Sequence, residues 1–211
     1  IHGNLSSSVY YMPLIERLSN EYRIIAPDLR GFGDSSYLSP FNTLKELATD
    51  IQLFLSELKI EKASIAGWSL GGGVAMEFAA RYPKSIDKLI LINSTTHKGY
   101  PIFKKDANQA PIFTEGYENK EEMAKDPVQV KPILEALATE NAFFMSYIYD
   151  LTIYTNQKPD QVTSNLLIKE TLKQRCLIDA DFALASLNMS DTPNLYSKGD
   201  NSIKNIKADT L

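Results

Sequence analysis

The chain is 211 residues long and 44% hydrophobic, which suits one domain with an insertion and a sizeable core. Its net charge of −4, without a block of basic residues, argues against nucleic acid or an anionic membrane as a partner. The single cysteine, Cys176, rules out an internal disulfide and is typical of a reducing cytoplasm, and no apolar run is long enough to span a membrane.

The first four residues, Ile1-His2-Gly3-Asn4, are typical of an apolar strand that ends in a loop. A histidine–glycine loop placed ahead of a G-x-S-x-G motif supplies a backbone N–H group to an oxyanion hole. We expect that donor to be the amide of Asn4. His2 is expected to brace the loop rather than to act in catalysis.

Helix-like and strand-like segments alternate as far as residue 93. The predicted order is helix Pro13–Ser19, strand Tyr22–Ala26, helix Leu44–Leu58, strand Ala63–Gly67, helix Val74–Arg81 and strand Leu89–Asn93. The strands are apolar throughout, as strands covered on both faces should be. Such alternation predicts an α/β fold with a mostly parallel sheet and helices on both faces.

A glycine-rich turn follows the strand predicted at 22–26. It is built on Pro27, Gly31 and Gly33. Asp28 and Arg30 lie within it, and we expect them to pair and hold the loop in shape.

The most informative stretch is Gly67-Trp68-Ser69-Leu70-Gly71, where a strand turns sharply into a helix. Small residues two positions either side of Ser69 let the strand and helix approach closely, and they hold the serine in a strained turn. The turn lifts the hydroxyl over the end of the sheet, as in a nucleophile elbow. The amide of Leu70 would be the second donor of the oxyanion hole.

Three stretches, I-H-G-N, P-D-L-R-G-F-G-D-S and G-W-S-L-G-G-G, resemble those of α/β-hydrolase-fold serine hydrolases. The resemblance covers residues 1 to about 96. It implies acyl transfer and ester hydrolysis, because dehalogenases that share H-G-N carry aspartate where this chain has Ser69. More loosely, the chain is similar to bacterial intracellular esterases, some described as short-chain polyhydroxyalkanoate depolymerases.

The resemblance implies a catalytic acid and a histidine base that follow the serine in the chain. Neither His2 nor His97 stands where the family places its base, and Asn93 cannot act as a carboxylate. Asp209 is not assigned as the acid. We therefore expect an internal fragment, incomplete at both termini, whose acid and base lie in a missing C-terminal segment.

Three regions follow from this interpretation: a partial core at 1–97, a helical cap insertion at 98–202, and a truncated return to the core at 203–211. A polar stretch, Lys98–Glu118, precedes helices predicted near Val128–Ala138, Ala142–Tyr154, Asn165–Cys176 and Phe182–Met189. Trp68 and His97 are possible pocket-lining residues. The aromatic run around Phe143 and Phe144 either packs ordinarily or lines an acyl pocket.

The sequence thus predicts a cytoplasmic carboxylic ester hydrolase that acts on a small-molecule ester and needs no metal or organic cofactor. Two alternatives remain open. One is a serine-dependent carbon–carbon bond hydrolase on the same fold. The other is a non-catalytic binding module, and the oligomeric state is not indicated.

Overall fold

The computed structural model describes residues 1–18 and 20–211. Within it, three strands form a short parallel sheet. Its strands are β1 (Ala63–Trp68), β2 (Ile86–Ile92) and β5 (Asp209–Thr210), in the order β1-β2-β5. Both pairings are parallel, with Gly67 opposite Leu91 and Lys88 opposite Asp209. The predicted strands at 63–67 and 89–93 are confirmed, the second beginning already at Ile86, and Asp209–Thr210 join the sheet as β5.

The segment predicted as a strand at Tyr22–Ala26 is not one. Residues 23–29 run without regular structure, and Ile24, Ile25 and Ala26 are half-buried. A strand exists only where a neighbour completes its ladder of hydrogen bonds, and none of the described residues pairs with this segment. Beside β1 lies Ile1 instead, whose amino group donates to Ala66 O at 2.5 Å and whose carbonyl accepts from Trp68 N at 3.0 Å.

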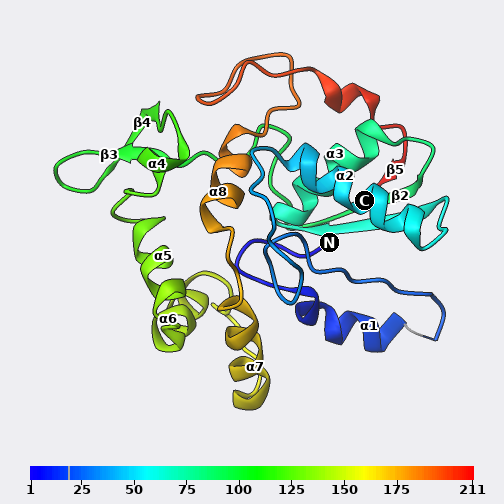
Figure 1. The fold of residues 1–211 in the computed structure, drawn as a ribbon, viewed down its shortest axis with the longest axis horizontal. Coiled ribbons are helices and arrows are strands. Elements are labelled where there is room, and N and C mark those ends of the chain that lie inside the picture. Colours follow the sequence, from blue (N-terminus) through cyan, green and yellow to red (C-terminus); the bar gives the residue numbers. More distant parts are fainter. Residues whose placement is uncertain (19) are drawn as a thin grey trace.

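Helices cover both faces of the sheet, as predicted (Figure 1). On one face lie α2 (Leu44–Glu57) and α3 (Leu70–Arg81), and on the other lie the 3-10 turn η1 (Ser8–Tyr11) and α1 (Met12–Leu18). Predicted helix 13–19 matches α1, apart from Ser19, which lies outside the described residues. A capping box between Thr43 and Glu46 fixes the start of α2.

Helix α3 starts at Leu70, four residues before the predicted start at Val74. The prediction treated Gly71, Gly72 and Gly73 as turn residues because glycine disfavours helices. All three are helical and buried, since the helix lies too close to its neighbours for larger side chains there.

Residues 98–202 form a hairpin and five helices. The elements are β3 (Phe103–Lys105), β4 (Pro111–Gly116), α4 (Lys120–Met123), α5 (Lys131–Ala138), α6 (Ala142–Thr152), α7 (Gln161–Thr171) and α8 (Leu177–Ser186). The 3-10 turn η2 (Ser202–Asn205) then leads into β5. Four of these helices overlap the four predicted ones, with shifted ends. The sequence analysis did not predict the hairpin, because the lysines, proline and glycine of 98–118 are typical of a polar loop. Two short strands nevertheless pair there around the turn at Asp106–Gln109.

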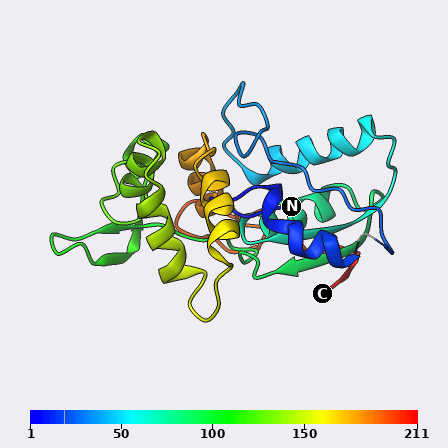
Figure 2. The ribbon, with the colours of Figure 1, turned by 90° about the horizontal axis from the view of Figure 1, so that it is seen from below.

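Helix α8 lies between the sheet and the hairpin with α5 and α6 in both views (Figure 1, Figure 2). It contributes to all three apolar clusters of the protein. Ala180 and Leu184 pack in the cluster around the sheet, Leu177 in the cluster of α5, α6 and α7, and Ala185 in the cluster beside α4. The described helices include none with the length and apolar character needed to cross a membrane.

Candidate active site

Ser69 occupies the turn between β1 and α3 with φ 53° and ψ −117°. A non-glycine residue in this region stores strain of about 1–3 kcal/mol, which the surroundings must impose. Here the backbone is held from two sides. Ser69 N donates to Ile92 O at 3.2 Å, and Ser69 O accepts from Thr95 N at 3.1 Å. The carboxyl ends of β1 and β2 thus fix the bend that carries the serine.

The glycines of the motif are required by close backbone contacts. A Cβ atom at Gly67 would lie 2.2 Å from Gly71 O, and one at Gly71 would lie 2.3 Å from Ile1 O and 2.4 Å from His2 O. Such distances are far inside van der Waals contact. Any side chain at these positions would push the strand, the helix or the first loop out of place.

The loop at residues 3–5 lies directly beside the elbow. A Cβ at Gly3 would be 3.1 Å from Ser69 Cβ. The amides of Asn4 and Leu70 donate no hydrogen bond to another group in the described residues. The N–H group of Asn4 on this loop and that of Leu70 at the start of α3 are therefore both free of protein partners within the described residues.

Residues of α6, of α7 and of the segment after α7 hold this loop in its conformation. Leu5 has φ 56°, and its N–H donates to Gln174 Oε1 at 2.9 Å. Its carbonyl accepts from Thr171 Oγ1 at 2.7 Å and from the Tyr149 hydroxyl. The backbone beside Ser69 is thus held by residues about 150 positions away in sequence.

A cavity of about 370 Å³ opens at Ser69. Its lining combines apolar surface, to which Tyr100, Ile102 and Leu184 contribute, with polar side chains. The polar residues include Asn4, Asn93, Thr95, Gln129 and Asp181. Neither Trp68 nor His97 is among the lining residues. The Trp68 ring packs against Tyr10, with centroids 5.8 Å apart, and His97 is a half-buried loop residue whose carbonyl accepts from Met189 N at 2.8 Å.

Asp181 on α8 is the one member of this lining that the sequence analysis missed and that carries a titratable carboxyl. It is 8% exposed, and its Oδ1 accepts from Asn4 Nδ2 at 2.8 Å. Burial raises its pKa to about 7. A sequence signal existed, since Asp179 and Asp181 interrupt an otherwise apolar helix.

His2 braces the loop as expected. It is 1% exposed, its Nδ1 donates to Gly3 O at 2.8 Å and its Nε2 accepts from Leu29 N at 3.0 Å. Burial lowers its pKa to about 4, so the ring is neutral. Both ring nitrogens are engaged, and His2 is therefore not free to act as a base.

Asp28 and Arg30 do not pair, which corrects the expectation for this turn. The Asp28 carboxylate accepts from the amides of Ser8 at 2.7 Å and Asp34 at 2.9 Å. Arg30 instead forms a two-pronged contact with Asp50, at 2.6 and 2.9 Å. The planar guanidinium fits both oxygens of one carboxylate on α2, which the backbone-engaged Asp28 does not offer.

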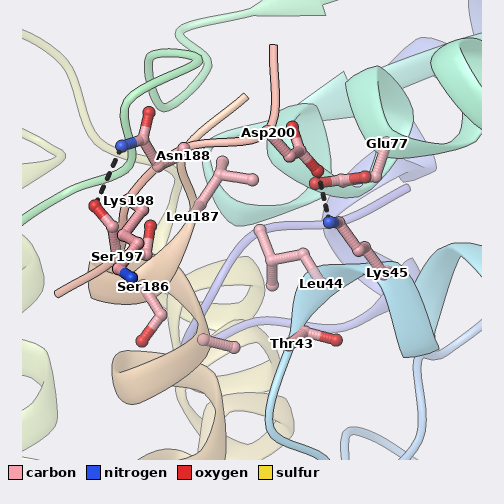
Figure 3. Close-up of a pocket in the computed structure, with 12 residues that line it drawn as sticks. Thr43, Leu44, Lys45, Glu77, Ser186, Leu187, Asn188, Ser197, Lys198 and Asp200 are labelled. Atoms are coloured by element: carbon pink, nitrogen blue, oxygen red, sulfur yellow. Dashed lines mark hydrogen bonds and ion pairs between the residues drawn. The ribbon is translucent and has the colours of Figure 1, made fainter. Parts of the chain in front are cut away.

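A second cavity, of about 280 Å³, lies between α2, α3 and the end of α8 (Figure 3). Its wall holds the buried Glu77, whose Oε2 lacks a hydrogen-bond partner and whose pKa burial raises to about 7. Lys45 and Asp200 pair next to it at 2.5 Å. No serine elbow opens here, so the Ser69 cavity is the candidate reaction site. Within residues 1–18 and 20–211, no group of three or more metal-ligating side chains is found.

The comparisons with known proteins agree with this geometry. The family model described as alpha/beta hydrolase fold matches residues 1–129. A putative carbamate hydrolase, RutD, of Agrobacterium fabrum is 38% identical over 89 residues, 42% of this chain and 34% of that protein. An uncharacterized Mycobacterium tuberculosis protein is 38% identical over 94 residues, 44% of this chain and 28% of its own length. The match thus spans about a third of these relatives.

Solved structures share the fold at low identity. The enol-lactonase of Burkholderia xenovorans LB400 superposes with a TM-score of 0.68 at 17% identity, over 99% of this chain and 68% of that one. The esterase EaEST of Exiguobacterium antarcticum gives a TM-score of 0.64 at 18% identity, over 90% and 66%. At such identities the likeness concerns the fold alone.

Proposed function

The chain belongs to the alpha/beta hydrolase fold family, and from that premise we propose that it carries the nucleophile of a carboxylic ester hydrolase. One observation carries the proposal. Ser69 stands in a strained turn with φ 53° and lines a cavity together with Asn4, and the amides of Asn4 and Leu70 donate to no other group of the described residues. Members of this family are typically hydrolytic enzymes, and a relative 38% identical is named as a putative carbamate hydrolase.

In the proposed reaction the Ser69 hydroxyl attacks the carbonyl carbon of an ester. The carbonyl electrons move to the oxygen, where the amides of Asn4 and Leu70 donate to the oxyanion. Each such donor is worth about 3 kcal/mol in the transition state because it is fixed before the reaction begins. Collapse expels the alcohol, and water then attacks the acyl-enzyme to release the acid and free Ser69.

The serine proton needs a base. His2 has both ring nitrogens engaged, and His97 does not line the Ser69 cavity. We therefore assign the base to a histidine outside these 211 residues, which would take the proton and return it to the leaving alcohol. Residues 98–202 would act as the cap that limits substrate size and excludes water. The buried free thiol of Cys176 fits a cytoplasmic location.

Nitrophenyl acetate hydrolysis and labelling by a fluorophosphonate test the assignment. We expect release of nitrophenol by the whole protein, and loss of about four to six orders of magnitude in kcat for Ser69→Ala. The label should add to the peptide that contains Ser69. Ser56→Ala, which alters an exposed serine on α2, is the matched control and should behave as wild type.

Unchanged turnover in Ser69→Ala would remove this residue from the mechanism. Labelling without turnover of any ester would favour the carbon–carbon bond hydrolase, which uses the same nucleophile. If the protein shows neither labelling nor turnover, the non-catalytic binding module becomes the favoured alternative.

A further inference from the structure

Asp181 is the only Asp, Glu, Lys, Arg or His side chain lining the Ser69 cavity in the described part of the chain. Its Oδ1 accepts from Asn4 Nδ2 at 2.8 Å, while its Oδ2 accepts no hydrogen bond within the described residues. One carboxyl oxygen is therefore held by the loop beside the nucleophile, and the other has no partner in the described part of the chain.

The other buried carboxylates of residues 98–202 each have a lysine partner. Asp126 pairs with Lys105 at 2.7 Å, Glu170 with Lys173 at 2.7 Å and Asp179 with Lys120 at 2.7 Å. Asp181 is also buried, yet it forms no ion pair with a Lys, Arg or His of the described residues. An unpaired buried charge costs several kcal/mol unless a partner arrives. Asp181 is thus the one buried carboxylate of residues 98–202 without a cationic side chain beside it, and it lines the Ser69 cavity.

We propose that Asp181 determines specificity in this cavity by pairing with a cationic ammonium group on the substrate, so that the preferred substrates are ammonium-bearing esters. That the ligand is an ester rests on the proposed function, whereas the pairing of Asp181 with an ammonium group does not. A hydroxyl group would fill one lone pair of Oδ2 but leave the charge uncompensated, whereas an ammonium group supplies the counter-charge. The ring of Tyr100, which also lines the cavity, offers a surface that a cation favours.

Binding can be measured without turnover in the Ser69→Ala background. The probes are acetylcholine, its neutral isostere 3,3-dimethylbutyl acetate, and 2-hydroxyethyl acetate, each titrated by calorimetry. We expect acetylcholine to bind about tenfold more tightly than either neutral ester, because one charge-assisted contact typically changes affinity by about that factor. Adding Asp181→Asn keeps the shape and the acceptor for Asn4 but removes the charge, and the preference should fall to about one.

Asp191→Asn is the matched control, because it removes the same charge from an exposed loop position. It should keep the full preference. Equal affinity for acetylcholine and its neutral isostere in the parent, or a preference that survives Asp181→Asn, would overturn the proposal. So would 2-hydroxyethyl acetate binding as well as acetylcholine.

The pH profile gives a second readout. Acetylcholine carries a fixed charge, so its affinity should rise from about pH 5 to about pH 8 as Asp181 ionises. The charged group that acts on Asp181 from the cap is Asp126, itself paired with Lys105. Asp181→Asn should flatten the profile, and a profile that stays unchanged contradicts the inference. A protein that binds acetylcholine this way but hydrolyses no ester would refute the proposed function and leave this inference standing.

Discussion

Asn4 and Asp181, 177 positions apart in sequence, are joined by a hydrogen bond of 2.8 Å from Asn4 Nδ2 to Asp181 Oδ1. The bond connects the loop beside the nucleophile to helix α8. Asn4 Oδ1 in turn accepts from Gln174 Nε2 at 2.8 Å. The position of the proposed oxyanion donor therefore depends on the side chains of Gln174 and Asp181 as well as on the local backbone.

Asn4→Ala is expected to destabilise the protein by about 2 kcal/mol, because Asp181 and Gln174 lose their partner in a buried place. Urea denaturation measures the loss. In a double-mutant cycle, Asn4→Ala should cost less when Asp181 is already Asn, since a neutral amide suffers less from the missing donor. Strictly additive effects would mean that the two residues are not coupled.

Gly71→Ala should destabilise the protein by about 3 kcal/mol or prevent folding, because its Cβ would meet two backbone carbonyls that cannot move aside. Gly73→Ala is the matched control in the same helix. Its Cβ would meet Leu44 Cδ1 at 2.6 Å and Thr95 Cγ2 at 2.9 Å, which are ends of side chains. Thermal unfolding should show a much smaller loss for Gly73→Ala. Similar losses would contradict the close approach at Gly71.

The carboxyl of Asp181 should make the protein less stable as the pH rises. Its pKa is about 7 in the folded chain against an ordinary value of 3.8. Between these values the unfolded chain has lost the proton that the folded chain still holds, so stability falls with rising pH. Asp181→Asn should therefore be more stable than wild type above about pH 7, with the difference vanishing near pH 4. Urea denaturation at several pH values checks this, and a constant difference would contradict it.

His2 should act in the opposite direction. Its pKa is lowered to about 4 from 6.5, so it supports the fold fully above 6.5 and loses that support as the pH falls toward 4. His2→Leu leaves the Leu29 N–H without an acceptor and should cost about 2 kcal/mol near neutral pH. The difference in free energy of unfolding between wild type and His2→Leu, measured by urea denaturation, should become smaller in acid. A difference that grows in acid would show that His2 is charged in the folded protein.

The sequence was sufficient to predict those features that local chemistry imposes. The G-x-S-x-G spacing predicts the turn at Ser69 because only glycines fit at 67 and 71. Apolar residues that recur every three or four positions from Leu44 to Leu58 predict helix α2. Its buried face matches that pattern except at Phe54 and Leu58, which are exposed. In both cases the residues that produce the structure lie close together in the sequence, so the pattern can be recognised without knowing the fold.

Features that depend on distant partners escaped prediction. Arg30 has two acidic candidates in sequence, Asp28 nearby and Asp50 on α2, and only the fold decides between them. The segment 22–26 has a strand's composition but no ladder partner among the described residues. Asp179 has a lysine beside it and Asp181 has none, and that difference is decided by the position of α4, which carries Lys120.

The sharing of α8 among three apolar clusters limits how this protein can be re-engineered. Ala180 and Leu184 belong to the same packed interior as the sheet, so exchanging all of residues 98–202 for a foreign segment would also remove part of the scaffold. Tyr149, Thr171 and Gln174 hold the loop beside Ser69, so the portion that can be exchanged ends before α6. Chimeras that retain Ala142 onward while borrowing the hairpin and α5 would keep these contacts.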